Sequence, residues 1–264
     1  MIPSAPVVQM EHVRHVFTSV DGSRFVAVDD LTLEVREGEI VSIVGKTGCG
    51  KSTMFNLLLG LENPTAGSIT VLGRDPYQDF DFFRAKFGVI FQTDRLLPWR
   101  TAFANAKVGL EILGYSEAEQ GEIARHWLHK LELMGFEDAY PHELSGGMRQ
   151  RVGIARAFCL SPDVFFADEA FGHLDQSTAQ RLREVFLTLI GETKKTCLLI
   201  THNIHEALEI GSRLIVLGKP SRVLYDVQCP TRASRAELVE FEERILDIIE
   251  RNEPHHEAAA RARS

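Results

Sequence analysis

The sequence predicts an α/β protein with an inserted, mostly helical subdomain, and three observations support this. An apolar run at 40–44 leads through a glycine-rich loop into a helical pattern, which reads as strand, phosphate-binding loop and helix. Further apolar runs at 87–91, 163–167 and 196–201 are typical of buried strands. Between about 92 and 159 the strand pattern disappears and helical spacing dominates, so this segment is predicted to be inserted between strands of the core.

Length and composition fit one large domain. The chain has 264 residues and a net charge of −8, which argues against a nucleic-acid partner. No apolar run is long enough to span a bilayer, and residues 1–6 lack the pattern of a secretory signal. The cysteines are far apart in sequence, so we expect reduced thiols in a cytosolic protein rather than disulfides or a zinc site: Cys49, Cys159, Cys197 and Cys229.

The chain begins with predicted strands. Residues 7–17 alternate in polarity, 21–23 form a turn, and 24–28 and 31–35 continue the strand pattern. Phe17 lies at the end of the first strand. On the residue alone, a place in the sheet core is the favoured interpretation, and stacking on an adenine ring is the alternative.

The glycine-rich loop fits G-x-x-x-x-G-K-[ST]. Its glycines let successive N–H groups turn inward at the start of a helix and form an anion site. Lys51 is predicted to reach the terminal phosphates and Ser52 to ligate Mg²⁺, with Thr53 beside it. A turn that binds nothing has no need of Lys-Ser-Thr at the helix start. The predicted phosphate-binding residues are Gly45, Lys46, Thr47, Gly48, Cys49, Gly50, Lys51, Ser52 and Thr53.

Two later strands end in residues suited to nucleotide chemistry. The run at 163–167 ends in Asp168 and Glu169, which are predicted to hold Mg²⁺ and to orient or deprotonate an attacking water. The strand at 196–201 ends at His202, which is placed to hydrogen-bond a terminal phosphate. Beside a phosphate loop the roles of Asp168 and Glu169 are favoured over acids that simply end a strand. A lone histidine is more often a structural residue, so for His202 this alternative stays open.

A second anion site is predicted at the start of another helix. Ser145, Gly146 and Gly147 precede a helical pattern that runs to about Phe158, and they offer free N–H groups and a hydroxyl. A simple N-cap explains the same residues equally well. The anion site is nevertheless favoured, because these residues occur in the same chain as the first phosphate-binding loop.

Capping residues mark three other predicted helices. Ser116 and Glu119 form a capping box that opens a helix, and Asp175 is placed to cap the helix that carries Phe186. Ser234 with Glu237 is expected to cap a last helix, and residues 253–264 are expected to be a disordered tail. The apolar face of the first of these helices is predicted to be Ile123, Trp127, Leu131 and Met134, and that of the last Leu238, Phe241, Ile245 and Ile248/Ile249.

Together these motifs resemble the nucleotide-binding subunit of an ATP-binding cassette (ABC) transporter, up to about Arg251. The stretch Leu144-Ser145-Gly146-Gly147-Met148-Arg149-Gln150 is the most specific match. The resemblance implies a P-loop NTPase (RecA-like) core with an antiparallel β subdomain and an inserted α-helical subdomain. It places the core at 1–91 and 160–228, the helical subdomain at about 92–159 and a C-terminal helix at 234–252, within one nucleotide-binding domain over 1–252.

The resemblance also implies site roles. ATP and Mg²⁺ are the expected cofactors, Ser52, Gln92 and Asp168 the metal ligands, and Ser145, Gly146 and Gly147 the half-site that completes the ATP site of a second copy. The further assignments are Phe17 as the adenine-stacking aromatic, Gly45 to Thr53 as Walker A, Gln92 as the Q-loop glutamine, Val164 to Asp168 as Walker B, Glu169 as catalytic glutamate, Leu174-Asp175 as D-loop and His202 as switch histidine. The expected catalytic residues are thus Glu169, His202 and Gln92, and Asp175 is expected to take part in binding the nucleotide.

Within that family, the stretch at 95–101 and the C-terminal Pro230-Thr231-Arg232 resemble the nitrate, sulfonate and taurine importer ATPases. The sequence departs from the family pattern at several positions, and none of these departures removes a catalytic group. They are Lys46 and Thr47 in the loop, Ala167 and Ala170 beside Asp168 and Glu169, and His173 before Leu174, the last of which could alter communication in a dimer.

The function expected from the resemblance is ATP hydrolysis by a head-to-tail dimer that drives a membrane importer for a small anionic or organic solute. The expected partners are a second copy, permease subunits contacted through 92–101 and, indirectly, an extracytoplasmic solute-binding protein. The expected location is the cytoplasmic face of the cell membrane. The alternative is a soluble ABC ATPase that acts in regulation or DNA repair, which usually carries coiled-coil insertions or basic surfaces that this chain lacks.

Overall fold

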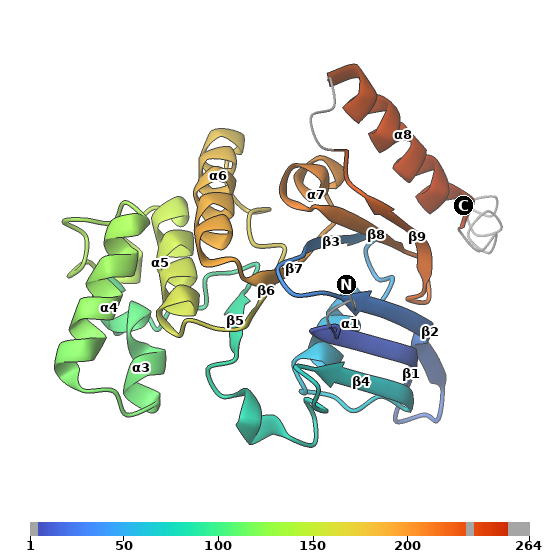
Figure 1. The fold of residues 1–264 in the computed structure, drawn as a ribbon, viewed down its shortest axis with the longest axis horizontal. Helices are drawn as coiled ribbons and strands as arrows, with labels where there is room; N and C mark the ends of the chain where they lie inside the picture. The colour runs from blue at the N-terminus through green and yellow to red at the C-terminus, as the bar shows by residue number, and fades with distance from the viewer. Residues whose placement is uncertain (1–4, 231–234, 253–264) are drawn as a thin grey trace.

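In the part of the chain that the structure describes, six strands form the central sheet, in the order β5-β6-β7-β3-β8-β9, and three more form a separate sheet in the order β2-β1-β4 (Figure 1). The computed structural model describes residues 5–230 and 235–252. The strands are β1 (Val8–Thr18), β2 (Arg24–Val35), β3 (Ile40–Gly45), β4 (Ala66–Val71), β5 (Phe87–Ile90), β6 (Val164–Asp168), β7 (Thr196–Thr201), β8 (Arg213–Leu217) and β9 (Val223–Gln228).

Helices connect these strands. They are α1 (Lys51–Leu58), α2 (Ala102–Ala106), α3 (Val108–Ile112), α4 (Glu117–Lys130), α5 (Gly146–Cys159), α6 (Gln176–Thr193), α7 (Ile204–Ile210) and α8 (Arg235–Arg251), with short 3-10 turns η1 (Phe80–Phe83) and η2 (Pro141–Glu143). All neighbouring strands from β5 to β8 pair in parallel, while β9 pairs with β8 in the antiparallel direction. The parallel order brings the C-terminal ends of β3, β5, β6 and β7 to one edge of the sheet, where ligands bind in open α/β folds.

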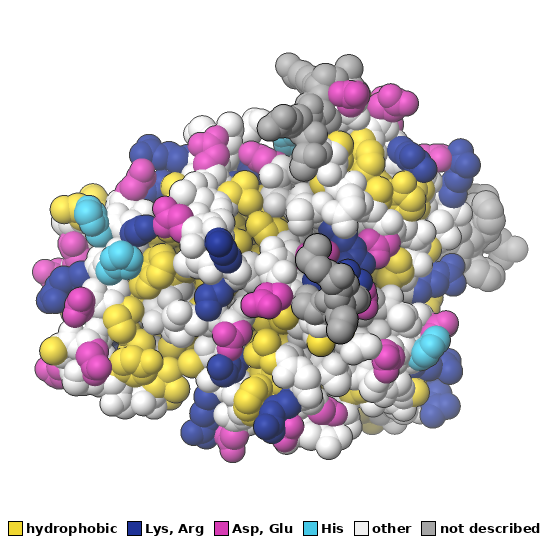
Figure 2. Space-filling view, in the orientation of Figure 1, with side chains coloured by type: hydrophobic (Ala, Val, Ile, Leu, Met, Phe, Trp, Pro, Cys, Tyr) yellow, Lys and Arg dark blue, Asp and Glu magenta, His cyan; other side chains and the backbone are white. Residues whose placement is uncertain are grey.

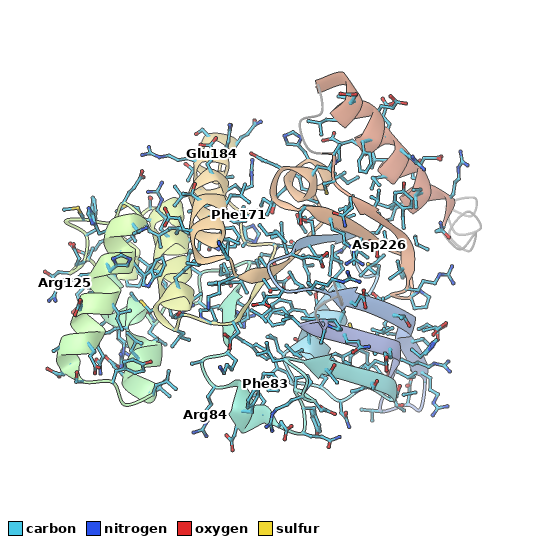
Figure 3. The ribbon with its side chains drawn as sticks, viewed as in Figure 1. Phe83, Arg84, Arg125, Phe171, Glu184 and Asp226 are labelled. Carbon is cyan, nitrogen blue, oxygen red and sulfur yellow. The ribbon has the colours of Figure 1, made fainter. Side chains whose placement is uncertain are left out.

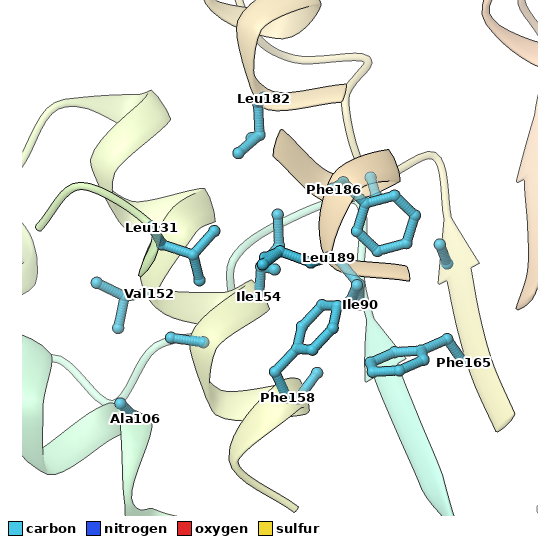
Figure 4. Close-up of a cluster of buried hydrophobic side chains, with 14 of the residues drawn as sticks. Ile90, Ala106, Leu131, Val152, Ile154, Phe158, Phe165, Leu182, Phe186 and Leu189 are labelled. Carbon is cyan, nitrogen blue, oxygen red and sulfur yellow. The ribbon is translucent and has the colours of Figure 1, made fainter. Parts of the chain in front are cut away.

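The central strands are apolar along their whole length because both faces of the sheet are covered. In β6, Phe165 and Ala167 join one core cluster while Val164 and Phe166 join another. On the first face, Phe158 of α5 packs on Phe165 with ring centroids 4.4 Å apart (Figure 4). Such two-sided burial replaces the alternating pattern of a half-exposed strand with a continuous apolar run.

The helices between β5 and β6 do not form a core of their own. Val152 of α5 and Phe186 of α6 belong to the same buried cluster as Ile90 and Phe165 of the sheet (Figure 4). Leu128 of α4 is also part of this cluster. The inserted helices lie at one end of the molecule in Figure 1, and the three-stranded sheet lies at the other. The expected fold class, a sheet core with an antiparallel sheet and inserted helices, is confirmed.

Several details differ from the sequence predictions. The segments 24–28 and 31–35 form one strand, β2, with irregular pairing to β1 around Asp30, whose φ is 52°. The Ser116 capping box opens α4 as predicted, but α4 ends at Lys130, so Met134 lies beyond the helix and is 63% exposed. Ser234, the expected cap of α8, and the tail at 253–264 lie outside the described residues.

Candidate functional site

The glycine-rich loop joins β3 to α1, as its pattern predicts. Gly48 and Gly50 have φ of 74° and 105°, and a Cβ at Gly50 would lie 2.3 Å from the carbonyl oxygen of Ala27. Only glycine fits there. Lys51 is 7% exposed, and its Nζ donates to the carbonyl oxygens of Gly45 at 2.5 Å and Lys46 at 3.0 Å. The ammonium is thus folded over the loop whose N–H groups form the predicted anion site.

Cys49 has a structural place in this loop. Its side chain is 1% exposed, and burial raises the pKa of its thiol. Its N–H donates to the carbonyl oxygen of Lys46 at 3.2 Å, and a Cβ on Gly45 would meet its Sγ at 2.8 Å. The thiol therefore packs inside the loop, and the cysteine N–H closes a turn.

Gln92, Glu169 and His202, the three residues expected to be catalytic, meet at one point. Gln92 Nε2 donates to Oε2 of Glu169 at 2.7 Å, and His202 Nδ1 lies 3.1 Å from Oε1 of Glu169. The three residues follow β5, β6 and β7, which are adjacent in the sheet. Glu169 has a φ of 46°, and its N–H donates to the carbonyl oxygen of Ile200 at 2.8 Å. A non-glycine residue in the left-handed region is strained, and such strain clusters at functional sites.

Asp168 precedes Glu169 at the end of β6. Burial, and then the charge of Glu169, raise the pKa of its carboxyl, while Lys51 and Arg95 act in the opposite direction. Two adjacent carboxylates in a half-buried position disfavour each other's ionisation, and a nearby cation relieves this. A carboxylate, a hydroxyl and an amide oxygen are ligands that Mg²⁺ accepts, so the residues fit the predicted metal.

The second predicted anion site has the local geometry of a capped helix. Ser145 Oγ accepts a 3.3 Å hydrogen bond from Met148 N at the start of α5. Ser145 and Gly146 are exposed, while a Cβ on Gly147 would meet Thr178 Cγ2 of α6 at 2.6 Å. The structure therefore shows the N-cap directly and leaves the hydroxyl and the exposed backbone facing outward.

Asp175 and Phe17 lie where the sequence places them. Asp175 caps α6 by accepting from Thr178 N, and its hydrogen bonds lower the pKa of its carboxyl to about 2. Phe17 on β1 is 40% exposed, so its ring is not a core side chain. This exposure removes the interpretation of Phe17 as an ordinary residue of the sheet core.

Sequence reasoning missed Gln150. This glutamine of α5 is 5% exposed, and its Nε2 donates to the carbonyl oxygens of Ala170 at 2.7 Å and Phe91 at 3.1 Å. Those carbonyls belong to the residues next to Glu169 and Gln92. A polar side chain at a buried position of a helix is the signal that indicates a role in holding the neighbouring backbone.

Two residues that depart from the family pattern, Ala170 and His173, differ in burial. Ala170 is 2% exposed and supplies the carbonyl that Gln150 binds, whereas His173 is exposed. Together with Gln92, Arg149 and Leu174, His173 lines a hollow of about 180 Å³ between α5 and the segment after β6. The departure from the family pattern at His173 therefore lies on a surface between the helix start at 145–147 and the segment that follows β6.

Fold and site together define an ATP-binding cassette, in which a phosphate loop, a strand ending in two acids and a capped glycine pair occur in one chain. A family model described as ABC transporter matches residues 28–172. This chain belongs to the ABC transporter family, and it is an ATPase of that family.

Relatives with known names show which members of the family this chain is similar to. The taurine import ATP-binding protein TauB of Yersinia pestis is 42% identical over 192 residues, which cover 73% of this chain and 74% of that protein. The nitrate import ATP-binding protein NrtC of Synechococcus elongatus is 35% identical over 240 residues, which cover 88% of this chain and 35% of that protein. The predicted resemblance to the nitrate, sulfonate and taurine group is therefore confirmed.

A solved structure supports the fold. The dimeric, post-hydrolysis state of the ATP-binding cassette MJ0796 bound to ADP and Pi superposes with a TM-score of 0.74 at 32% identity, covering 85% of this chain and 99% of that one. Among the described residues, no helix of this chain has the length and apolar character that a membrane crossing needs.

Proposed function

We propose that this protein is the ATP-hydrolysing subunit of a membrane importer and that two copies bind ATP between them. The phosphate loop of one copy would face residues 145–147 of the other. In one chain these segments open helices with different neighbours, because α1 packs on β2, β4 and β6 while α5 packs on α2, α4, α6 and β5. The solved relative is itself a dimer with ADP and Pi. A site shared between two chains makes use of both segments.

The contact of Gln92 and His202 with Glu169 is the observation that carries the proposal. Each carboxylate oxygen of Glu169 has one nitrogen neighbour, so the carboxylate is held in one orientation. Glu169 accepts the proton of the attacking water, and Gln92 orients the group that receives it. Because Nδ1 of His202 faces Glu169, its Nε2 is the nitrogen left to donate to the terminal phosphate.

Other residues of the predicted site would bind the phosphates and the metal. Lys51 swings from the carbonyl oxygens of the loop to the phosphates, and the N–H groups of the loop hold them. Among the described residues, no group of three His, Cys, Asp or Glu is arranged to hold a metal. Mg²⁺ would take Asp168 as its carboxylate, with Ser52 and Gln92 as further ligands. When bound, it neutralises charge on the phosphates.

The permease is proposed to dock beside Gln92. Trp99 is 70% exposed at the tip of the loop at 97–101, which the fully buried Asn105 ties in place. Separately, an apolar groove of about 270 Å³ has Phe91, the residue before Gln92, in its lining. Figure 3 labels Phe83 and Arg84 on this side of the molecule, and Figure 2 shows hydrophobic side chains among charged ones there. The groove is lined by Leu59, Leu61, Phe80, Phe83, Arg84, Phe87, Val89 and Phe91.

This docking surface favours the importer over the soluble regulatory or repair ATPase. An exposed tryptophan and an apolar groove suit a protein partner, whereas a nucleic-acid partner calls for a basic surface. The cytoplasmic face of the membrane follows as the proposed location. Because the named relatives are taurine and nitrate import proteins, we propose a small anionic or organic solute for the assembled importer. The segment at about 92–159 is likewise proposed as the inserted helical subdomain, which contacts the permease through residues 92–101.

The decisive experiment is Glu169→Gln. ATP binding is expected to persist while turnover falls by at least about 100-fold, because the variant keeps the shape of the side chain and loses the base. Lys51→Ala is expected to weaken ATP binding itself. Glu184→Gln on the exposed side of α6 (Figure 3) is a matched control that should retain both properties. Wild-type turnover by Glu169→Gln would show that another group is the base.

A further inference from the structure

His15 lies two residues before Phe17 on β1 and therefore on the same face of the strand. The two rings meet edge to face, with centroids 4.7 Å apart and planes at 78°. His15 is 8% exposed and Phe17 is 40% exposed. One ring is thus a buried support and the other an open surface, which is the arrangement that a stacking platform needs.

The imidazole has an oxygen atom close to each of its nitrogens. Nδ1 lies 3.1 Å from the carbonyl oxygen of Asn63 and donates to it, since a carbonyl only accepts. Nε2 lies 3.1 Å from Oε2 of Glu62. That oxygen is buried and has no hydrogen-bond partner in the described part of the chain. Rotation of the ring would separate both pairs, so His15 is a fixed neighbour for Phe17.

Glu62 connects His15 to the phosphate-binding helix. Its Oε1 accepts a 2.9 Å hydrogen bond from Nδ2 of Asn56, which lies on α1. The same helix begins with Lys51 and Ser52. A chain of contacts, from Phe17 through His15 and Glu62 to Asn56, therefore runs from β1 to the helix that carries the phosphate-binding side chains.

We propose that His15 is a positioning residue for the nucleotide base. It holds the ring of Phe17 in the orientation that stacks on adenine, and through Glu62 and Asn56 it fixes the distance between that ring and the phosphate loop. A pre-ordered ring loses less freedom when the base binds, and this raises affinity. The inference rests on the proposed function, because it requires that ATP bind with its base on Phe17.

The test measures equilibrium binding of ATP and of inorganic tripolyphosphate to the full-length protein. His15→Leu is expected to weaken ATP binding by about 3- to 10-fold, which is the range for one aromatic pair, and to leave tripolyphosphate binding unchanged. In steady-state turnover the KM for ATP should rise while kcat stays the same, because the base is held equally in ground and transition states.

A double-mutant cycle separates positioning from general stability. If His15 acts through Phe17, adding His15→Leu to Phe17→Ala should weaken ATP binding by no more than Phe17→Ala alone. His126→Leu is the matched control, because His126 also meets an aromatic ring, that of Trp127, edge to face at 5.2 Å but on the helical side of the molecule. It should leave ATP binding unchanged.

Three outcomes would overturn the inference. They are unchanged ATP affinity in His15→Leu, a loss of equal size in the Phe17→Ala background, and a parallel loss of tripolyphosphate binding. If His15→Leu does not fold, Glu62→Ala releases the imidazole from α1, and the same selective loss of ATP binding is expected. A wild-type protein that binds neither ligand would overturn the proposed function as well, whereas ATP binding that is insensitive to position 15 would overturn only the inference.

Discussion

Gln92 donates a hydrogen bond of 2.7 Å from Nε2 to Oε2 of Glu169, across 77 positions of the chain. The contact exists because β5 and β6 pair in parallel, with Ile90 opposite Ala167, so that the residues two positions further on emerge at the same edge. Gln150 fixes this arrangement by binding the carbonyl oxygens of both neighbours, Phe91 and Ala170. The position of α5 is thereby linked to the orientation of the proposed base.

The first prediction concerns that hydrogen bond. Gln92→Ala removes one of the two nitrogen neighbours of Glu169, and turnover is expected to fall about 10-fold, the lower end for a hydrogen bond to a charged group. ATP affinity should change much less. Initial-rate kinetics and equilibrium binding measure the two effects. Gln180→Ala is the matched control, because Gln180 also donates to a glutamate, Glu184 at 3.3 Å, on the exposed side of α6. Equal losses in the two variants would contradict the prediction.

The second prediction compares two glycines of the phosphate loop. Both have positive φ, 74° at Gly48 and 105° at Gly50, but a Cβ meets nothing within 4 Å at Gly48 and the Ala27 carbonyl oxygen at 2.3 Å at Gly50. Gly48→Ala is expected to lower the free energy of unfolding by about 1–2 kcal/mol, the cost of a left-handed alanine. Gly50→Ala should cost more, because backbone must also move. Urea unfolding of both variants decides this, and equal costs would refute the role assigned to the contact.

The third prediction concerns the pH dependence of stability through Glu206 of α7. This carboxyl is 3% exposed, and burial raises its pKa from 4.5 to about 6, although Arg183 and His202 act against the rise. The folded protein therefore holds the proton more tightly than the unfolded chain. The stability that the proton contributes is complete below pH 4.5 and is lost as the pH rises to about 6.

Glu206→Gln should consequently gain stability relative to the natural protein as the pH rises. The difference in the free energy of unfolding is expected to grow between pH 4.5 and 6 and to level off near about 2 kcal/mol. Urea unfolding at a series of pH values measures it. Glu184→Gln, at an exposed position of α6, should give a difference that does not change over this range. A constant difference for Glu206→Gln would contradict the assigned cause.

The sequence was informative wherever a local pattern determines the structure. The apolar runs before Gly45, Asp168 and His202 are buried strands, and the caps at Ser116 and Asp175 form as predicted. Strand, loop and helix in close succession leave few alternatives, because the glycine positions and the strand ends are set by backbone sterics and burial.

Contacts between distant segments could not be predicted in the same way. Neither the ring of His15 against Phe17 nor the bridge from Gln150 to Ala170 follows from periodicity, because each depends on how two elements pack. Met134 shows the same limit: its spacing from Leu131 fits one helical face, but α4 ends at Lys130 and the chain turns away. The burial of Phe17 was also misjudged on residue type alone, since an aromatic at the end of a strand of a small sheet can stay open to solvent.

The last prediction separates the shape of the proposed docking loop from its contact surface. Asn105 is fully buried, and its side chain bonds Leu97 N at 2.7 Å and three carbonyl oxygens, those of Leu97, Arg100 and Thr101. Asn105→Ala leaves these groups unpaired and should lower the free energy of unfolding by about 1–3 kcal/mol. Trp99 is 70% exposed, so Trp99→Ala should change it by less than about 0.5 kcal/mol. Urea unfolding of both variants is the measurement. A large loss for Trp99→Ala would mean that the indole stabilises the chain itself, and its exposure would then no longer support a surface reserved for a partner.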